Sequence, residues 1–162
     1  MKISLTGLKG GHSGVDIHLG RANANKLMFR FLKEAVRDYG ARLSSVDGGS
    51  LRNAIPREAF AVITIPGDNV EALWELVSDY REMYRYEYKG IEHNINFTAE
   101  MTDMPATLIP EEIQDDLINA IEGCQNGVIS MLVDFPGTVE SSTNLAIVKS
   151  SNEMIEIQIL VR

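Results

Sequence analysis

The segment AFAVITIPGDNVEALWELVSDY, residues 59–80, changes from the pattern of a strand to that of a helix within a few residues. Residues 59–65 are apolar and rich in β-branched side chains, and Pro66-Gly67-Asp68-Asn69 is a typical turn sequence. This composition predicts a strand that is covered on both faces. From Val70 to about Tyr88 the apolar residues recur at helical spacing. The buried stripe expected on this helix consists of Leu73, Trp74, Val77, Tyr80 and Tyr84.

Comparable patterns flank this segment on both sides. Before it, we expect a strand at residues 2–5, a helix from the N-cap Asn23 to a stop at Gly40, and a strand at residues 42–46. After it, residues 95–101 alternate between apolar and polar, which predicts a half-buried strand. The order strand, helix, strand, strand, helix, strand predicts an α/β (α+β) fold of the ferredoxin-like type. In that fold both helices cover one face of an antiparallel sheet.

The rest of the chain predicts an extension of this fold. The expected elements are a helix at residues 111–122 and strands at 127–133, 145–148 and 154–162. We therefore divide the chain into a ferredoxin-like part, residues 1–103, and an additional α/β lobe of the same domain, residues 104–162. Strand patterns reach both ends of the sequence, which favours a domain taken from a larger protein.

The composition limits the partners of the chain. Its 162 residues include 15 Lys and Arg against 23 Asp and Glu, a net charge of −8. No nucleic-acid partner is expected, because nucleic-acid binders need a basic surface. No membrane partner is expected either, since the sequence has no block of like charges and no apolar run of the ~18 residues that a span requires. The single cysteine, Cys124, excludes an internal disulfide framework and fits a cytoplasmic protein.

The glycine-rich segment GLKGGHSG, residues 7–14, is the most informative motif. Its glycines allow positive φ and a close approach of the backbone to a ligand. His12 stands among them with no bulky neighbour beside it. A phosphate loop would need Gly-Lys-Ser/Thr leading into a helix, and that order is absent. The residues alone leave two interpretations open, a loop that wraps a ligand and a structural turn.

A second glycine motif is GGSLRNAIPREA, residues 48–59. Asn53 supplies an amide that can donate to a carboxylate, and Pro56 stiffens the loop beside it. An ordinary Asx-type turn before a strand has the same composition. On the residues alone, the ordinary turn is the better interpretation.

Metal ligands are sparse. His12, Asp16 and His18 can be drawn as a ligand set, but no helix or strand period brings all three together. The acidic pair at residues 111–112 stands at an expected helix start, where carboxylates stabilise the exposed amides. We therefore expect no metal and no other cofactor in this chain.

Three segments together resemble the aminoacyl-histidine dipeptidases, which are cytosolic, rather non-specific dipeptidases of the M20 metallopeptidase family. The segments are GLKGGHSG at residues 7–14, NANKL at 23–27 and LRNAIPREA at 51–59. Weaker similarities follow in the same order at residues 126–129, 139–145 and 157–162. The resemblance thus runs nearly from end to end.

This resemblance implies the lid domain of a zinc-dependent dipeptidase that hydrolyses Xaa-His and other dipeptides. In such enzymes a separate catalytic domain carries two zinc ions and a glutamate base, and the lid closes over the substrate. The ligand motifs of that catalytic domain are absent here, so the resemblance implies an inactive chain. By the match, His12 would be catalytic, as a donor that stabilises the oxyanion. Asn53 would contact the substrate's carboxylate or reacting carbonyl, and Arg162 would clamp the carboxylate.

The implied partners are the protein's own catalytic domain, a dipeptide substrate and a second copy of the chain. Related lids pair, and the expected sheet edge at residues 94–101 offers a surface for a homodimer. The competing hypothesis is a free-standing ferredoxin-like module for ligand binding or oligomerisation, whose glycine loops hold an amino acid or an anion. Strand patterns at both ends of the sequence favour the lid domain.

Overall fold

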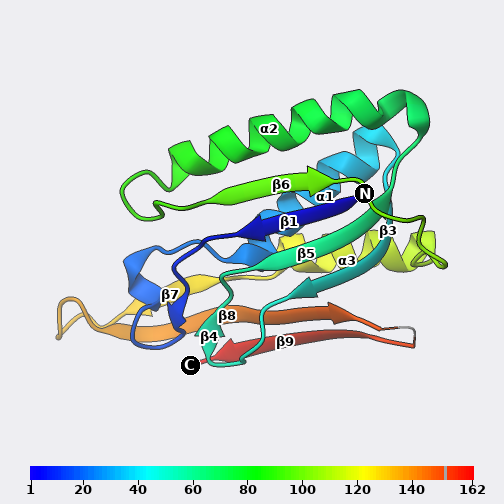
Figure 1. The fold of residues 1–162 in the computed structure, drawn as a ribbon. Helices are drawn as coiled ribbons and strands as arrows, with labels where there is room; N and C mark the ends of the chain where they lie inside the picture. Colours follow the sequence, from blue (N-terminus) through cyan, green and yellow to red (C-terminus); the bar gives the residue numbers. More distant parts are fainter. Residues whose placement is uncertain (152) are drawn as a thin grey trace.

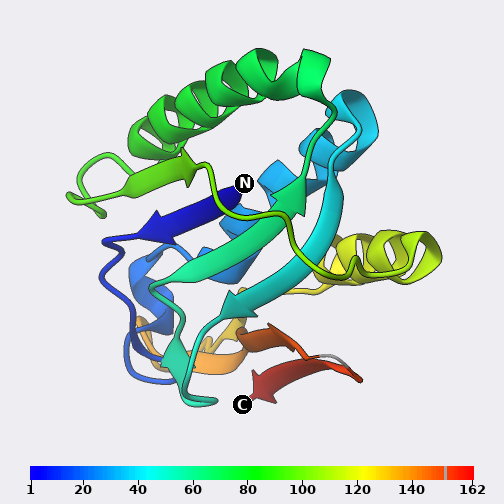
Figure 2. The same ribbon diagram turned by 45° about the vertical axis from the view of Figure 1, so that its right-hand side comes forward.

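The computed structural model describes residues 1–151 and 153–162. Four antiparallel strands form the first half of the main sheet in the order β6-β1-β5-β3. Figures 1 and 2 show the helices on one side of this sheet. The predicted ferredoxin-like fold is therefore confirmed. Its elements are β1 (Lys2–Thr6), α1 (Ala24–Tyr39), β3 (Arg42–Gly48), β5 (Ala59–Thr64), α2 (Val70–Glu87) and β6 (Asn96–Glu100).

The second part of the chain continues the same sheet. β8 pairs with β3 through Asp47↔Lys149 and Gly48↔Val148, and it also pairs with β7 and β9. β8 begins at Val139, earlier than predicted. The sequence pattern misses this start because residues 140–144 are polar and show no apolar alternation. The added elements are α3 (Glu111–Gly123), β7 (Gly127–Met131), β8 (Val139–Ser150) and β9 (Ile155–Val161).

Helix α1 begins and ends at the predicted residues. The Asn23 side chain accepts hydrogen bonds from the backbone N–H groups of Asn25 and Lys26, which would otherwise lack partners in the first turn. Gly40 ends the helix in the left-handed conformation, with φ of 69°. The Lys26 ammonium donates to the carbonyls of Ile121, Glu122 and Cys124 at 2.7, 2.9 and 3.0 Å. The start of α1 is thereby bound to the end of α3, where the helix dipole favours a cation.

The buried stripe of α2 differs from the prediction at one position. Trp74 is exposed and Leu76 is buried, because the stripe follows the spacing i, i+3, i+4, i+7 and i+11 from Leu73. The predicted double coverage of β5 is also wrong, since only alternate residues are buried against the helices and the others are half-buried. Tyr84 is fully buried, and burial raises the pKa of its phenol, so the hydroxyl remains protonated and donates to the Leu27 carbonyl at 2.6 Å. The aromatic rings that pack edge to face in this core belong to Phe31, Tyr80, Tyr84 and Phe97.

A small antiparallel ribbon stands apart from the main sheet. It consists of β2 (Gly11–His12) and β4 (Ala54–Ile55), and the sequence patterns did not predict it. Two residues are too few to show a strand period. Both views place β4 close to the C-terminal end of β9 (Figures 1 and 2). Two 3₁₀ turns, η1 (Ile17–Leu19) and η2 (Gly67–Asn69), complete the elements. None of the helices in the described residues is both long and apolar enough to cross a membrane.

The glycine-rich loop is anchored by one buried carboxylate. Glu92 is 5% exposed, and its Oε2 accepts the Lys9 N–H at 2.8 Å while its Oε1 accepts the Ala22 N–H at 3.1 Å. Such charge-assisted bonds are stronger than neutral ones. Glu92 therefore fixes the position of the loop before β2 relative to the residues before α1.

Replacing Glu92 by Gln should destabilise the chain by about 1–3 kcal/mol, because the amide places an NH₂ group against one of two backbone donors. Urea denaturation would measure the loss. Hydrogen exchange at the Lys9 and Ala22 amides should accelerate at the same time. The exposed Glu75 offers a matched control, since Glu75→Gln should change neither quantity. Unchanged exchange at both amides in Glu92→Gln would contradict this anchoring role.

Candidate functional site

The β2–β4 ribbon brings together two motifs that are far apart in the sequence. His12 pairs with Ala54, and the Ser13 N–H donates to the Asn53 carbonyl at 2.9 Å. The glycine-rich loop and the Asn53 loop are thus bound to each other through their backbones. His12 is half-buried, and Asn53 is exposed in the turn directly before β4.

Arg162 reaches the same place from the end of β9. Its backbone N–H and carbonyl both bond with Ser142 of β8, each at 2.9 Å. A Cβ atom added to Gly14 would lie 3.3 Å from Arg162 Cδ and 3.3 Å from His12 Cε1. The Arg162 side chain and the His12 ring therefore both lie beside Gly14. All three residues that the resemblance singled out, His12, Asn53 and Arg162, gather around this ribbon.

The orientation of the His12 ring is fixed by two backbone donors. The N–H groups of Gly14 and Val15 both donate to Nδ1, at 3.1 and 3.0 Å. An Nδ1 that accepts two hydrogen bonds carries no hydrogen, so the neutral ring has its hydrogen on Nε2. Among the described residues none forms a hydrogen bond with Nε2. His12 can therefore donate one hydrogen bond to a group outside this chain.

Asn144 attaches the ribbon to the main sheet. This side chain is fully buried on β8, and its Nδ2 donates to the Ala54 carbonyl at 2.8 Å. On the same strand, the Leu145 N–H donates to Asn126 Oδ1, which also accepts from Asn23 Nδ2, both at 2.9 Å. The sequence patterns missed Asn144 because it lies in the polar run at the start of β8. The burial of the Asn144 amide, which marks it as a structural contact, becomes visible only when the position of β8 in the sheet is known.

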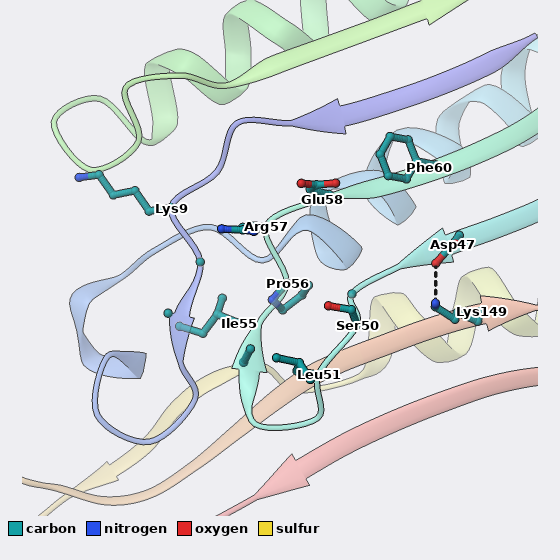
Figure 3. A pocket seen from close by; sticks show the side chains of 14 residues that line it. Lys9, Asp47, Ser50, Leu51, Ile55, Pro56, Arg57, Glu58, Phe60 and Lys149 are labelled. Carbon is teal, nitrogen blue, oxygen red and sulfur yellow. Dashed lines mark ion pairs between the residues drawn. The ribbon is translucent and has the colours of Figure 1, made fainter.

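A hollow of about 730 Å³ lies beside the ribbon, on the side of the glycine-rich loop. Figure 3 shows Lys9 at one side of this hollow and the ion pair between Asp47 and Lys149 at the other. The nitrogen and oxygen of that pair are 3.2 Å apart. Arg57 and Glu58 add one charge of each sign to the lining. The hollow suits a polar occupant with both charges, and it borders the residues that pair in the ribbon.

The described residues do not form a metal site. No group of three or more His, Cys, Asp or Glu side chains in the described part of the chain is placed to hold a metal ion. Asp16 accepts the His12 N–H at 2.8 Å and lies 3.4 Å from the Arg21 guanidinium, so it is engaged within its own turn. His18 is exposed on η1. The zinc ions implied by the resemblance do not fit the described residues of this chain.

Comparison with known proteins gives matches in both sequence and structure. Residues 3–92 match the sequence model of the M20 family described as the peptidase dimerisation domain. The chain is 39% identical over 161 residues to the cytosol non-specific dipeptidase of Escherichia coli (strain K12), covering 99% of the chain and 33% of that protein. The crystal structure of aminoacylhistidine dipeptidase from Vibrio alginolyticus superposes with a TM-score of 0.96 at 40% identity, again covering 99% of this chain and 33% of that one.

The chain thus spans about a third of the length of these relatives. The family match covers more than half of the chain and includes the glycine-rich loop, the ribbon and both helices of the ferredoxin-like part. Agreement in sequence and in structure extends over almost all the remaining residues. The chain therefore belongs to the peptidase dimerisation domain family of the M20 peptidases.

Proposed function

We propose that this chain is the lid domain of an M20 dipeptidase and supplies substrate contacts to an active site that a separate catalytic domain completes. The observation that carries the proposal is the meeting of His12, Asn53 and Arg162 at one ribbon, although they come from three distant parts of the sequence. A structural turn alone would not require a hydrogen-bond donor, an amide and a guanidinium at one point. The two dipeptidase relatives agree with this proposal.

In this proposal His12 acts on the scissile peptide. Its Nε2–H donates to the carbonyl oxygen of the dipeptide and stabilises the negative charge that develops there during attack. Because Nδ1 is held by the amides of Gly14 and Val15, the ring need not reorganise before it donates. A donor that is already in place stabilises the transition state more than a free one would.

Asn53 and Arg162 would hold the other end of the substrate. The Asn53 amide can donate to a carboxylate or to the reacting carbonyl. The Arg162 guanidinium can bind a carboxylate through two parallel hydrogen bonds. A clamp of this kind requires a free C-terminus, which would restrict the enzyme to short peptides. Side-chain specificity for Xaa-His or other dipeptides would come from pockets shared with the catalytic domain.

The rest of the proposed enzyme lies outside this chain. Two zinc ions, which supply a metal-activated water when bound, would be held by residues of the catalytic domain. We propose a cytoplasmic location, in line with the E. coli relative, which is named a cytosol dipeptidase. We also propose that residues 1–103 and 104–162 are two lobes of one lid.

His12→Ala should lower the hydrolysis of a dipeptide by about 100-fold or more, because a single oxyanion donor contributes about 10²–10³ in turnover. The assay uses the full-length protein encoded by the gene that contains these residues, supplied with zinc. The 162-residue chain alone should show no hydrolysis. The exposed His18 gives a matched control, and His18→Ala should keep the activity of the unaltered protein.

Two results would reject the lid assignment. One is a gene that encodes only these residues, with no metal-ligand motifs around them. The other is a full-length protein that hydrolyses no dipeptide, or that does so equally well without His12. In either case the free-standing binding or oligomerisation module becomes the better hypothesis.

The dimerisation surface of the proposed enzyme would be the outer edge of β6. In the described residues β6 pairs with β1 alone, whereas β8 occupies the opposite edge of the ferredoxin-like sheet at β3. An unpaired strand edge can extend across a two-fold axis into a second copy. Met101, which follows β6, is 67% exposed and adds apolar surface at this edge.

Light scattering of the 162-residue chain at high concentration should give a mass of about twice 18.0 kDa. Met101→Lys should shift the equilibrium toward the monomer, because it places a charge at the proposed contact. Met154 is 66% exposed and directly precedes β9, on the side of the sheet opposite to β6. Met154→Lys is therefore the matched control and should leave the dimer intact. A monomer at all concentrations would argue against pairing through this domain.

A further inference from the structure

The turn that carries His12 satisfies its backbone donors in an uninterrupted series. Five consecutive N–H groups, from residue 12 to residue 16, each have a hydrogen-bond acceptor. His12 Nδ1 accepts two of these N–H groups, and the carbonyls of His12 and Asn53 accept one each. The remaining N–H group, that of His12 itself, donates to the Asp16 carboxylate at 2.8 Å. The imidazole is therefore part of the turn and depends on Asp16 for closure.

Arg21 holds the other side of the same turn. Its Nη1 donates to the Gly10 carbonyl at 2.6 Å and lies 3.4 Å from Asp16 Oδ2. The arginine side chain is 24% exposed and the aspartate side chain 27%, so both are mostly withdrawn from water. Between them runs the backbone of Gly11, where an added Cβ would overlap Arg21 Nη1 and Asp16 Oδ2. The pair thus encloses the backbone of residues 10–12.

We infer that Asp16 and Arg21 are positioning residues for His12, because they close the turn that keeps Nδ1 on two amides and the hydrogen on Nε2. Neither residue needs to touch a substrate for this role. The ring geometry is a property of the chain alone, whereas its use in catalysis rests on the proposed function. Removing Asp16 leaves the His12 N–H without its acceptor, so the turn can open and the ring can rotate away from the amides of Gly14 and Val15.

Nitrogen NMR of the histidine rings tests this inference in the 162-residue chain, at a pH where the rings are neutral. The His12 signals should show a hydrogen-free Nδ1 and a protonated Nε2. His18 and His93, both exposed, provide internal references for unconstrained rings. In Asp16→Ala the His12 signals should move to the positions of these two references. Asp16→Asn should restore the original signals in part, because its amide oxygen can still accept the His12 N–H.

Two controls separate positioning from general loss of structure. Asp47→Ala breaks another ion pair, with Lys149 at 3.2 Å, and should leave the His12 signals unchanged. Gly11→Ala displaces the Asp16–Arg21 pair without removing either charge and should reproduce the effect of Asp16→Ala. Gly137→Ala controls for backbone strain, since Gly137 also has a positive φ (85°) but no atom near its Cβ position. It should have no effect on the ring.

In the full-length enzyme, Asp16→Ala should lower kcat about 10–100-fold with little change in KM, and Asp16→Asn should recover part of the loss. Unchanged His12 ring signals in a folded Asp16→Ala or Gly11→Ala chain would overturn the positioning inference. By contrast, altered ring signals in Asp16→Ala, together with full activity of His12→Ala, would support the positioning inference and reject the proposed function. The two ideas can therefore fail independently.

Discussion

The hydrogen bond from the buried Asn144 side chain to the Ala54 carbonyl connects the small ribbon to the main sheet. Through β4 it fixes the Asn53 loop, and through the pairing of β4 with β2 it fixes His12. Ser142 lies two positions before Asn144 on the same strand. Its backbone N–H and carbonyl form hydrogen bonds with the carbonyl and N–H of Arg162. β8 therefore serves as the common platform of the candidate site, although it carries none of the three side chains itself.

This arrangement explains why the elements added after β6 matter. The family match ends at residue 92, yet both relatives agree with nearly the whole chain. The added strands attach to the edge at β3, where only Asp47 and Gly48 pair with β8. A ferredoxin-like sheet without them would keep the Glu92 anchor of the glycine-rich loop but would lose the bond from Asn144 that holds β4. The extension thus completes a site whose motifs lie in the first half of the sequence.

The sequence predicts the regular elements well and the site less well, for physical reasons that particular residues illustrate. Helix α1 was found to the residue, because Asn23 and Gly40 are strong local capping signals. The predicted stripe on α2 includes the apolar Trp74, whereas the helical spacing from Leu73 favours Leu76, which is the buried residue. The early start of β8 has no apolar alternation to mark it, and this part of the strand is held by pairing with β7 and β9.

Long-range partners could not be predicted in the same way. Glu92 accepts hydrogen bonds from residues more than sixty positions away, and no local pattern marks a carboxylate for such a role. The sequence suggests Asp16 only as one member of a metal-ligand set. In the structure its carboxylate accepts the His12 N–H and forms an ion pair with Arg21. His12, Asn53 and Arg162 were singled out by resemblance, and their spatial proximity is new information from the structure. Their individual roles in a reaction stay predictions.

The contact of Lys26 with the last carbonyls of α3 has a mechanical consequence. It joins the start of α1 to the end of α3, the helix that leads into β7, so these two helices cannot move past each other without breaking three charge-assisted bonds. In an enzyme that opens and closes around its substrate, such a domain would move as a rigid body. His12 and Arg162 would then travel together at a constant separation, and the hinge would have to lie elsewhere in the polypeptide.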